Sequence, residues 1–185
     1  MIQLQFFSQY IKHPRRVGAI LPSSRKLAAQ MVSTINFDSS ECIIEFGPGT
    51  GVFTEQLIQR KQPHTKLLLM ENNKEFYEML RIKYGAIENV HVIHDSAERI
   101  VHYTAALGVE RVDYVVSGLP FASLPKGVSE RILTETRKVL GEDGEFITFQ
   151  YSKFKQKYLQ SFFSEIQIDK VVFNMPPAFV FKCVQ

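Results

Sequence analysis

The chain lacks the features that would place it within a membrane or in an oxidising compartment. It has no tryptophan, only two cysteines, and no apolar run approaching the roughly 20 residues that cross a bilayer. The charges near its N-terminus are not followed by an uninterrupted apolar segment, so we expect no secretory signal. A lone pair of cysteines, Cys42 and Cys183, lies in apolar strand-like runs, which favours buried free thiols over a disulfide. We therefore expect a cytoplasmic protein.

The chain also has no histidines or cysteines at metal-ligand spacing. Among its five histidines, His91 and His94 are three residues apart in a probable strand, so their side chains point to opposite faces. We predict no metal site.

Acidic residues are missing from the first 37 positions. This segment carries five basic residues, a formal charge of +5, whereas the rest of the chain has 17 basic against 19 acidic residues. The basic residues are Lys12, Arg15, Arg16, Arg25 and Lys26. Such a concentration of positive charge favours an anionic partner, either phospholipid headgroups or nucleic acid.

After Phe37, short β-rich runs alternate with helical patterns, which is typical of βαβ units and a mainly parallel sheet. The length of 185 residues suits a single domain, 1–185, in which 1–37 form an N-terminal helical segment. The predicted strands are 43–47, 67–71, 90–94, 112–117, 145–150, 166–173 and 178–184. Only four residues separate the last two runs, so these should pair as an antiparallel hairpin.

Two helix starts can be read from capping residues. Ser23 or Ser24 is placed to cap a helix in the N-terminal segment. Asn72, followed three residues later by Glu75, resembles a capping box that opens the helix after the second strand. The chain is therefore predicted to be α/β, with a seven-stranded, mostly parallel sheet, an antiparallel last strand and helices on both faces.

A glycine-rich loop at residues 47–51 closes the first strand. Glycine tolerates positive φ and leaves no Cβ in the way of a ligand. Dinucleotide enzymes space this loop as G-x-G-x-x-G, but here it is G-x-G-x-G, with Glu45 two residues ahead of the first glycine. A carboxylate there would repel a pyrophosphate but suits the ammonium group of a methionine moiety. The loop thus favours S-adenosylmethionine (SAM), which methyl transfer converts to S-adenosylhomocysteine.

Acidic residues also end the next two strands. Glu71 follows the glycines by about twenty residues, where a carboxylate can accept both ribose hydroxyls, and Asp95 is placed to accept from the adenine amino group. Together they indicate a Rossmann-like class I methyltransferase. The predicted cofactor-binding residues are Glu45, Gly47, Pro48, Gly49, Thr50, Gly51, Glu71, Asn72, Asp95, Ser96 and Ala97.

A proline turn follows the fourth strand, where this fold faces the sulfonium methyl. It reads Ser117, Gly118, Leu119, Pro120 and Phe121. A rigid turn with a polar residue and an aromatic is suited to holding an acceptor nitrogen, although an ordinary turn would have the same composition.

The glycine loop and the Leu-Pro-Phe turn resemble the rRNA adenine dimethylase superfamily, and more closely its phospholipid N-methyltransferase branch. Four stretches, 17–24, 44–51, 117–121 and 174–180, carry the resemblance. It implies SAM-dependent methylation of a lipid amine such as phosphatidylethanolamine, with related enzymes acting on ornithine lipids.

Two departures separate the chain from the adenine dimethylases. Those enzymes resemble one another in an Asn or Asp at the start of the turn, whereas Ser117 is a shorter and poorer acceptor. They also generally carry an additional helical C-terminal region for RNA, whereas this sequence ends soon after its last predicted strand.

The N-terminal segment also suits contact with a lipid surface. Four apolar and aromatic residues at helical spacing, Phe6, Phe7, Tyr10 and Ile11, precede its basic cluster. Such a segment can lie in an anionic membrane interface, peripheral to the inner face of the cell membrane, or pack on the sheet as a lid.

Methyl transfer mainly requires that a neutral amine be held in line with the C–S bond. We expect Ser117 and the carbonyls of Gly118 or Leu119 to orient that amine, with Phe121 forming a wall and Tyr10 closing the site. RNA adenine-N6 methylation is the alternative activity, and a non-catalytic SAM- or membrane-binding module is the alternative from another class. The sequence does not indicate an oligomeric state.

Overall fold

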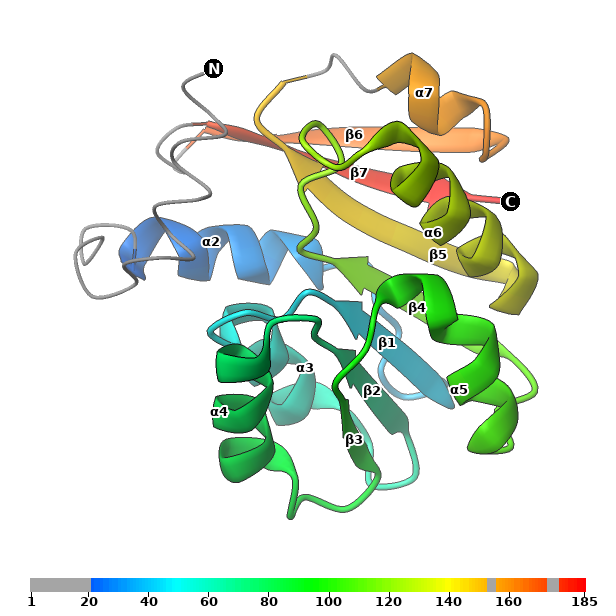
Figure 1. Cartoon of the computed structure of the whole chain (residues 1–185). Helices are drawn as coiled ribbons and strands as arrows, with labels where there is room; N and C mark the ends of the chain where they lie inside the picture. The colour runs from blue at the N-terminus through cyan, green and yellow to red at the C-terminus, as the bar shows by residue number, and fades with distance from the viewer. Residues whose placement is uncertain (1–20, 153–155, 173–176) are drawn as a thin grey trace.

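A computed structural model describes residues 21–152, 156–172 and 177–185, and within this range one seven-stranded sheet runs through the molecule (Figure 1). Its strands are β1 (Cys42–Phe46), β2 (Lys66–Met70), β3 (Val90–Ile93), β4 (Val112–Ser117), β5 (Leu140–Gln150), β6 (Glu165–Val171) and β7 (Ala178–Val184).

The strand order is β3-β2-β1-β4-β5-β7-β6. The first five strands in this order are mutually parallel, and β7 is antiparallel to both of its neighbours, β5 and β6. The predicted α/β fold with an antiparallel last strand is confirmed. Six of the seven predicted strands match to within two residues at each end.

The exception is β5, which begins at Leu140, five residues before its predicted start. Leu140 pairs with Val112, and Glu145 pairs with Tyr114, so four residues of β5 stand opposite a single residue of β4. These four residues, Gly141–Gly144, include two glycines and two acidic residues, so they fall outside the apolar run from which the strand was predicted.

Helices cover both faces of the sheet (Figure 1). They are α2 (Leu21–Met31), α3 (Val52–Arg60), α4 (Lys74–Tyr84), the 3₁₀ turn η2 (Ala97–Arg99), α5 (Ile100–Ala106), α6 (Lys126–Val139) and α7 (Gln156–Gln160). One core cluster joins α2, α3 and α4 to the sheet, and a second joins α5, α6 and α7 to it. Both faces of the central strand β1 are therefore buried, which explains its continuous apolar run.

The two predicted helix caps need correction. The helix α2 begins at Leu21, so Ser23 and Ser24 lie inside its first turn and not before it. The cap of α4 is Asn73, whose side chain accepts from the backbone N–H groups of Glu75 and Phe76. A cap must directly precede the first helical residue, and Asn72 is one position too early for this.

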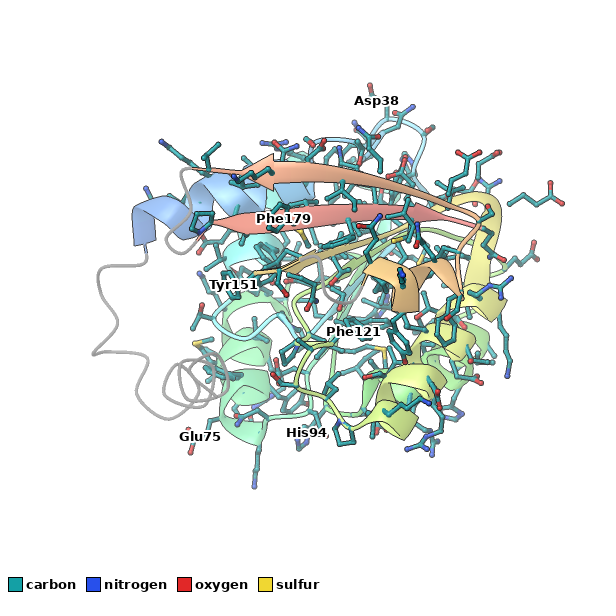
Figure 2. All side chains as sticks on the ribbon, turned by 90° about the horizontal axis from the view of Figure 1, so that it is seen from above. Asp38, Glu75, His94, Phe121, Tyr151 and Phe179 are labelled. Atoms are coloured by element: carbon teal, nitrogen blue, oxygen red, sulfur yellow. The ribbon has the colours of Figure 1, made fainter. Side chains whose placement is uncertain are left out.

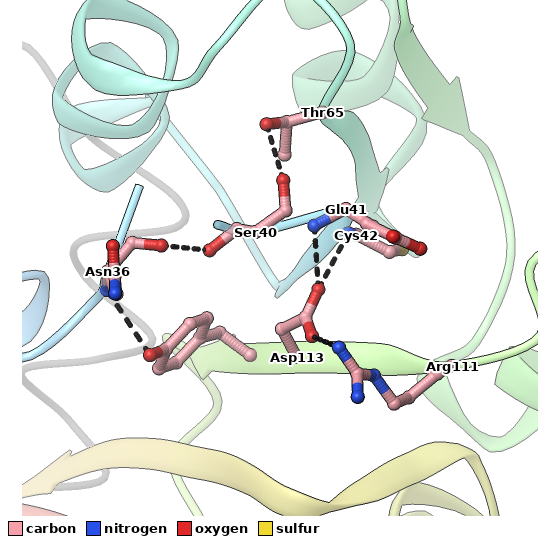
Figure 3. A network of polar contacts seen from close by, with 8 residues as sticks. Asn36, Ser40, Glu41, Cys42, Thr65, Arg111 and Asp113 are labelled. Atoms are coloured by element: carbon pink, nitrogen blue, oxygen red, sulfur yellow. Dashed lines mark hydrogen bonds and ion pairs between the residues drawn. The ribbon is translucent and has the colours of Figure 1, made fainter. Parts of the chain in front are cut away.

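A polar network joins the amino ends of β1 and β4 (Figure 3). The Asp113 carboxylate accepts from the backbone N–H groups of Glu41, at 2.8 Å, and Cys42, at 3.0 Å. It also forms an ion pair with Arg111 at 3.0 Å. The network fixes the start of β1 beside the start of β4. It thereby fixes the register of the two strands and the positions at which they end.

Both cysteines, Cys42 and Cys183, are free thiols in the same core cluster, as predicted, and burial raises the pKa of each to about 12. Across the described ranges, we find no helix with the length and apolar character needed to cross a bilayer. The same residues contain no group of three potential metal ligands.

Candidate active site

The loops that follow the parallel strands meet at one edge of the sheet. Backbone hydrogen bonds tie them together: Gly47 donates to Met70 at 2.9 Å, Gly118 to Phe46 at 2.8 Å, and Glu71 to Ile93 at 3.0 Å. The predicted cofactor loop, acidic strand ends and proline turn are therefore neighbours. In an open α/β sheet this edge is where ligands bind.

The glycine loop adopts a backbone that other residues rarely accept. Gly47, Gly49 and Gly51 have φ values of 62°, 55° and 85°. A Cβ on Gly47 would lie 2.8 Å from Leu119, whereas a Cβ on Gly49 would meet no protein atom within 4 Å. The loop thus packs against the proline turn at one glycine and leaves room for a ligand at the other.

Glu45 is wholly buried at the end of β1, directly below this loop. One carboxylate oxygen accepts from the Thr54 hydroxyl at 2.7 Å, and the other has no hydrogen-bond partner among the described residues. Burial is the main cause that raises the Glu45 pKa to about 8, and the charge of Glu71 adds to it. A buried carboxylate lacking a donor suits a cationic group or a bound water, so these residues fit the amino acid end of SAM.

Glu71, which directly follows β2, holds the glycine loop in place and is 7% exposed. Its carboxylate accepts from the backbone N–H of Gly49 at 3.0 Å and from that of Asn73 at 2.8 Å. A carboxylate has about four acceptor positions. Glu71 can therefore hold the loop and still accept from a ribose hydroxyl.

Asp95 lies beyond β3, where it is held as an anion. One oxygen accepts from the Ser96 N–H at 2.7 Å and the other from the Tyr103 hydroxyl at 2.9 Å. The bond from Ser96 is the main cause that lowers the Asp95 pKa. Ser96 also caps η2, and Ala97 is buried as the first residue of that turn.

The proline turn is built differently from the prediction. Ser117 is fully buried, and its hydroxyl accepts from the backbone N–H of Leu119 at 3.2 Å. Phe121 is also fully buried and packs edge-on against Phe146, with ring centres 5.8 Å apart. The Ser117 side chain therefore shapes the turn, and the Phe121 ring supports it from within the core instead of walling an open site.

The turn and the cofactor loop are in contact through glycine. A Cβ on Gly118 would lie 2.7 Å from the carbonyl oxygen of Gly47. After Gly118 the chain turns tightly, because the Pro120 carbonyl accepts from the backbone N–H groups of Ser123 and Leu124. The backbone of Gly118 and Leu119 is thus held against the predicted position of the cofactor.

Three residues of this region were missed at the sequence level. Thr54 and Tyr103 hold the carboxylates of Glu45 and Asp95, and Thr148 donates to the Ser117 carbonyl at 3.4 Å. Each is separated from its partner by at least eight positions, and no motif marks it. Of the predicted site residues, Tyr10 lies outside the described residues.

In sequence, the chain is similar to known methyltransferases. A family model described as ribosomal RNA adenine dimethylase matches residues 18–140. An ornithine lipid N-methyltransferase of Singulisphaera acidiphila is 27% identical over 179 residues, which cover 96% of this chain and 93% of that protein. A probable ribosomal RNA small subunit methyltransferase A of Pyrococcus furiosus is 30% identical over 117 residues, 63% of this chain and 41% of that protein.

Among solved structures, the chain is similar to a 1,6-didemethyltoxoflavin-N1-methyltransferase of Burkholderia thailandensis with bound S-adenosylhomocysteine. The TM-score is 0.70 at 12% identity, and the match covers 100% of this chain and 87% of that chain. At this identity the similarity shows the fold alone.

Proposed function

Because the chain belongs to the ribosomal RNA adenine dimethylase family and is a SAM-dependent methyltransferase, we propose that it methylates the amine of a lipid headgroup. The observation that carries this proposal is that Ser117 and Phe121 are both fully buried. The Ser117 hydroxyl accepts from the Leu119 N–H, and the Phe121 ring packs against Phe146. A turn built in this way offers neither a side-chain acceptor nor an aromatic face to a nucleobase. It suits a small aliphatic amine held by backbone carbonyls.

The comparisons add support for a lipid acceptor. The similarity to the ornithine lipid N-methyltransferase extends over nearly the full length of both proteins. The similarity to the ribosomal RNA methyltransferase covers less than half of that enzyme. Phosphatidylethanolamine and ornithine lipid both carry a primary amine, so both are candidate acceptors.

We assign the cofactor to the edge of the sheet where Glu45, Glu71 and Asp95 meet the glycine loop. Gly47–Gly51 would receive the amino acid part, and the Glu45 oxygen that lacks a partner among the described residues would bind its ammonium group, directly or through water. Glu71 and Asn72 would hold the ribose, and Asp95, Ser96 and Ala97 would hold the adenine. When bound, the cofactor supplies an electrophilic methyl group.

The chain's own contribution to catalysis is chiefly positioning. An in-line displacement needs the acceptor nitrogen about 3 to 3.5 Å from the methyl carbon, and such orientation is worth several kcal/mol. In this proposal the Gly118 and Leu119 carbonyls accept hydrogen bonds from the amine and so orient its lone pair. The close approach of Gly118 to Gly47 fixes the position of these carbonyls relative to the cofactor loop.

The basic N-terminal segment brings the enzyme to its substrate. Residues 1–16 contain Lys12, Arg15 and Arg16 and the apolar positions that suit a membrane interface. Arg25, on α2, adds an exposed positive charge within the described residues. We propose that these residues contact anionic lipids and that Tyr10 closes the site.

The test uses SAM carrying a labelled methyl group. The full chain is incubated with anionic liposomes containing phosphatidylethanolamine, with liposomes containing ornithine lipid, and with total rRNA. Label in either lipid extract supports the proposal. Label in RNA alone would establish adenine methylation, which the family and the ribosomal RNA relatives favour, and would refute the lipid assignment.

A second experiment tests the membrane contact. Deleting residues 1–16 should weaken liposome sedimentation at least tenfold and leave SAM affinity within a factor of three. The double variant Arg15→Gln with Arg16→Gln is the matched control for charge and should show an intermediate loss. If the deletion leaves liposome binding unchanged, the segment does not contact the membrane and acts only as a lid.

A further inference from the structure

Gln150 is a buried polar residue to which no role has yet been given. It is the last residue of β5 and only 5% exposed, and its side-chain nitrogen has no hydrogen-bond partner among the described residues. An amide nitrogen carries two donors. Leaving such a group buried and unpaired is costly, so its retention calls for a physical reason.

The pairing of β5 places Gln150 two residues beyond the last β4–β5 pair, at the edge of the sheet where the proline turn begins. Ser117, the last residue of β4, pairs with Thr148, so the next step along the sheet brings Gln150 level with Leu119. At that level β4 has ended and the turn has begun. The amide nitrogen, which lacks a partner among the described residues, thus lies at the same edge of the sheet as the turn that holds the acceptor amine in our proposal.

The alternation of β5 places the side chain on the same face as the turn. Phe146, Thr148 and Gln150 share one face, because successive side chains of a strand point to opposite sides. Phe146 on this face touches Phe121, and Leu119 packs in the same core cluster. Across the sheet, Gln150 pairs with Phe179, which also packs on this cluster. Phe179, Phe121 and Tyr151, the residue after Gln150, are labelled in Figure 2.

We propose that Gln150 binds the methyl acceptor by donating its side-chain N–H to an anionic oxygen near the reacting amine. This inference rests on the proposed function and specifies the second group that a substrate must carry. The oxygen belongs to a phosphodiester in phosphatidylethanolamine and to a carboxylate in ornithine lipid.

An uncharged donor is the appropriate chemistry at this place. A lysine or arginine would bind an oxyanion more strongly, but its charge would oppose the sulfonium and the cationic product. A carboxylate would favour the protonated form of the amine, which has no lone pair to attack. The amide of Gln150 holds the oxyanion without either effect.

The test compares Gln150→Leu with the wild-type chain. Leucine fills nearly the same volume but donates no hydrogen bond. The KM for the lipid acceptor should rise at least tenfold, while SAM affinity measured by calorimetry stays within a factor of two. Because the side-chain nitrogen that is replaced has no hydrogen-bond partner among the described residues, Tm should stay the same or rise. Gln150→Glu, which presents a negative charge to the substrate oxyanion, should raise KM further.

Parallel assays with phosphatidylethanolamine and with ornithine lipid identify the source of the oxygen, since only the lipid that uses Gln150 will show the higher KM. Gln59→Leu, at an exposed glutamine of α3, is the matched control and should leave both KM values unchanged. A structural role would instead lower Tm and weaken SAM and acceptor binding together.

Two results would overturn the inference, and they are distinguishable. If the wild-type chain methylates a lipid and Gln150→Leu leaves every lipid KM within a factor of two, Gln150 does not bind the acceptor and the proposed function stands. If the wild-type chain labels only RNA, the proposed function fails, and this inference fails with it.

Discussion

Replacing Glu45 by glutamine should make the protein more stable at neutral pH and less able to bind SAM. The Glu45 pKa is raised from 4.5 to about 8, first by burial and then by the charge of Glu71. Between these two values the folded chain holds a proton that the unfolded chain has released. The free energy of unfolding should therefore fall as pH rises from 4.5 to 8, by about 1.4 kcal/mol per pH unit at most.

This change of unfolding free energy with pH determines how much stability Glu45→Gln should gain. At pH 7 the buried carboxyl costs about 3 kcal/mol relative to an unperturbed one, and above pH 8 the cost levels off near 5 kcal/mol. Glu45→Gln cannot ionise, and its amide oxygen can still accept from Thr54. Its free energy of unfolding should thus lack this pH-dependent loss and exceed that of the wild-type chain at pH 7.

The assay is urea denaturation at half-unit steps from pH 4.5 to pH 8.5, without cofactor, together with SAM titration at pH 7. Glu165→Gln, at an exposed carboxyl on β6, is the control and should keep the wild-type slope. SAM affinity should fall at least tenfold in Glu45→Gln and not in the control. Equal slopes for Glu45→Gln and the wild-type chain would refute the reasoning that burial keeps this carboxyl neutral.

Three further substitutions test other contacts. Gly118→Ala places a Cβ 2.7 Å from the carbonyl oxygen of Gly47 and should reduce kcat by about 100-fold through misplacement of the turn; a kcat within threefold of wild type would contradict this. Gly49 has a φ of 55° and open space where a Cβ would lie. Gly49→Ala should lower the free energy of unfolding by about 1 to 2 kcal/mol and weaken SAM binding, measured by calorimetry. Retained affinity would show that the cofactor does not approach this loop. Asp169→Ala removes the ion-pair partner of the buried Lys182, 2.7 Å away. It should lower the free energy of unfolding in urea by about 3 kcal/mol. The double variant Lys182→Met with Asp169→Leu should recover most of this loss, and no recovery would mean that the loss came from packing.

The alternation of short β-rich runs with helical patterns was enough to predict the architecture. Buried parallel strands read as continuous apolar stretches, and a strand-to-helix turn with positive φ reads as glycine, so both appear in local sequence. Glu45, Glu71 and Asp95 could be placed at one edge for the same reason, since the carboxyl ends of parallel strands must meet. The one-residue error at the Asn73 cap and the predicted start of β5, five residues too late, are failures at element boundaries, where local patterns are weakest.

Only the tertiary structure decided which polar groups are already used and which await a ligand. The Ser117 hydroxyl and the Phe121 ring were predicted to hold the substrate, and the structure shows both residues fully buried, in contact with Leu119 and Phe146. Conversely, one oxygen of Glu45 and the side-chain nitrogen of Gln150 lack a hydrogen-bond partner within the described part of the chain, and no sequence pattern indicates this. Hydrogen-bond satisfaction depends on residues brought together from distant parts of the chain, whereas a motif records only the spacing of neighbours.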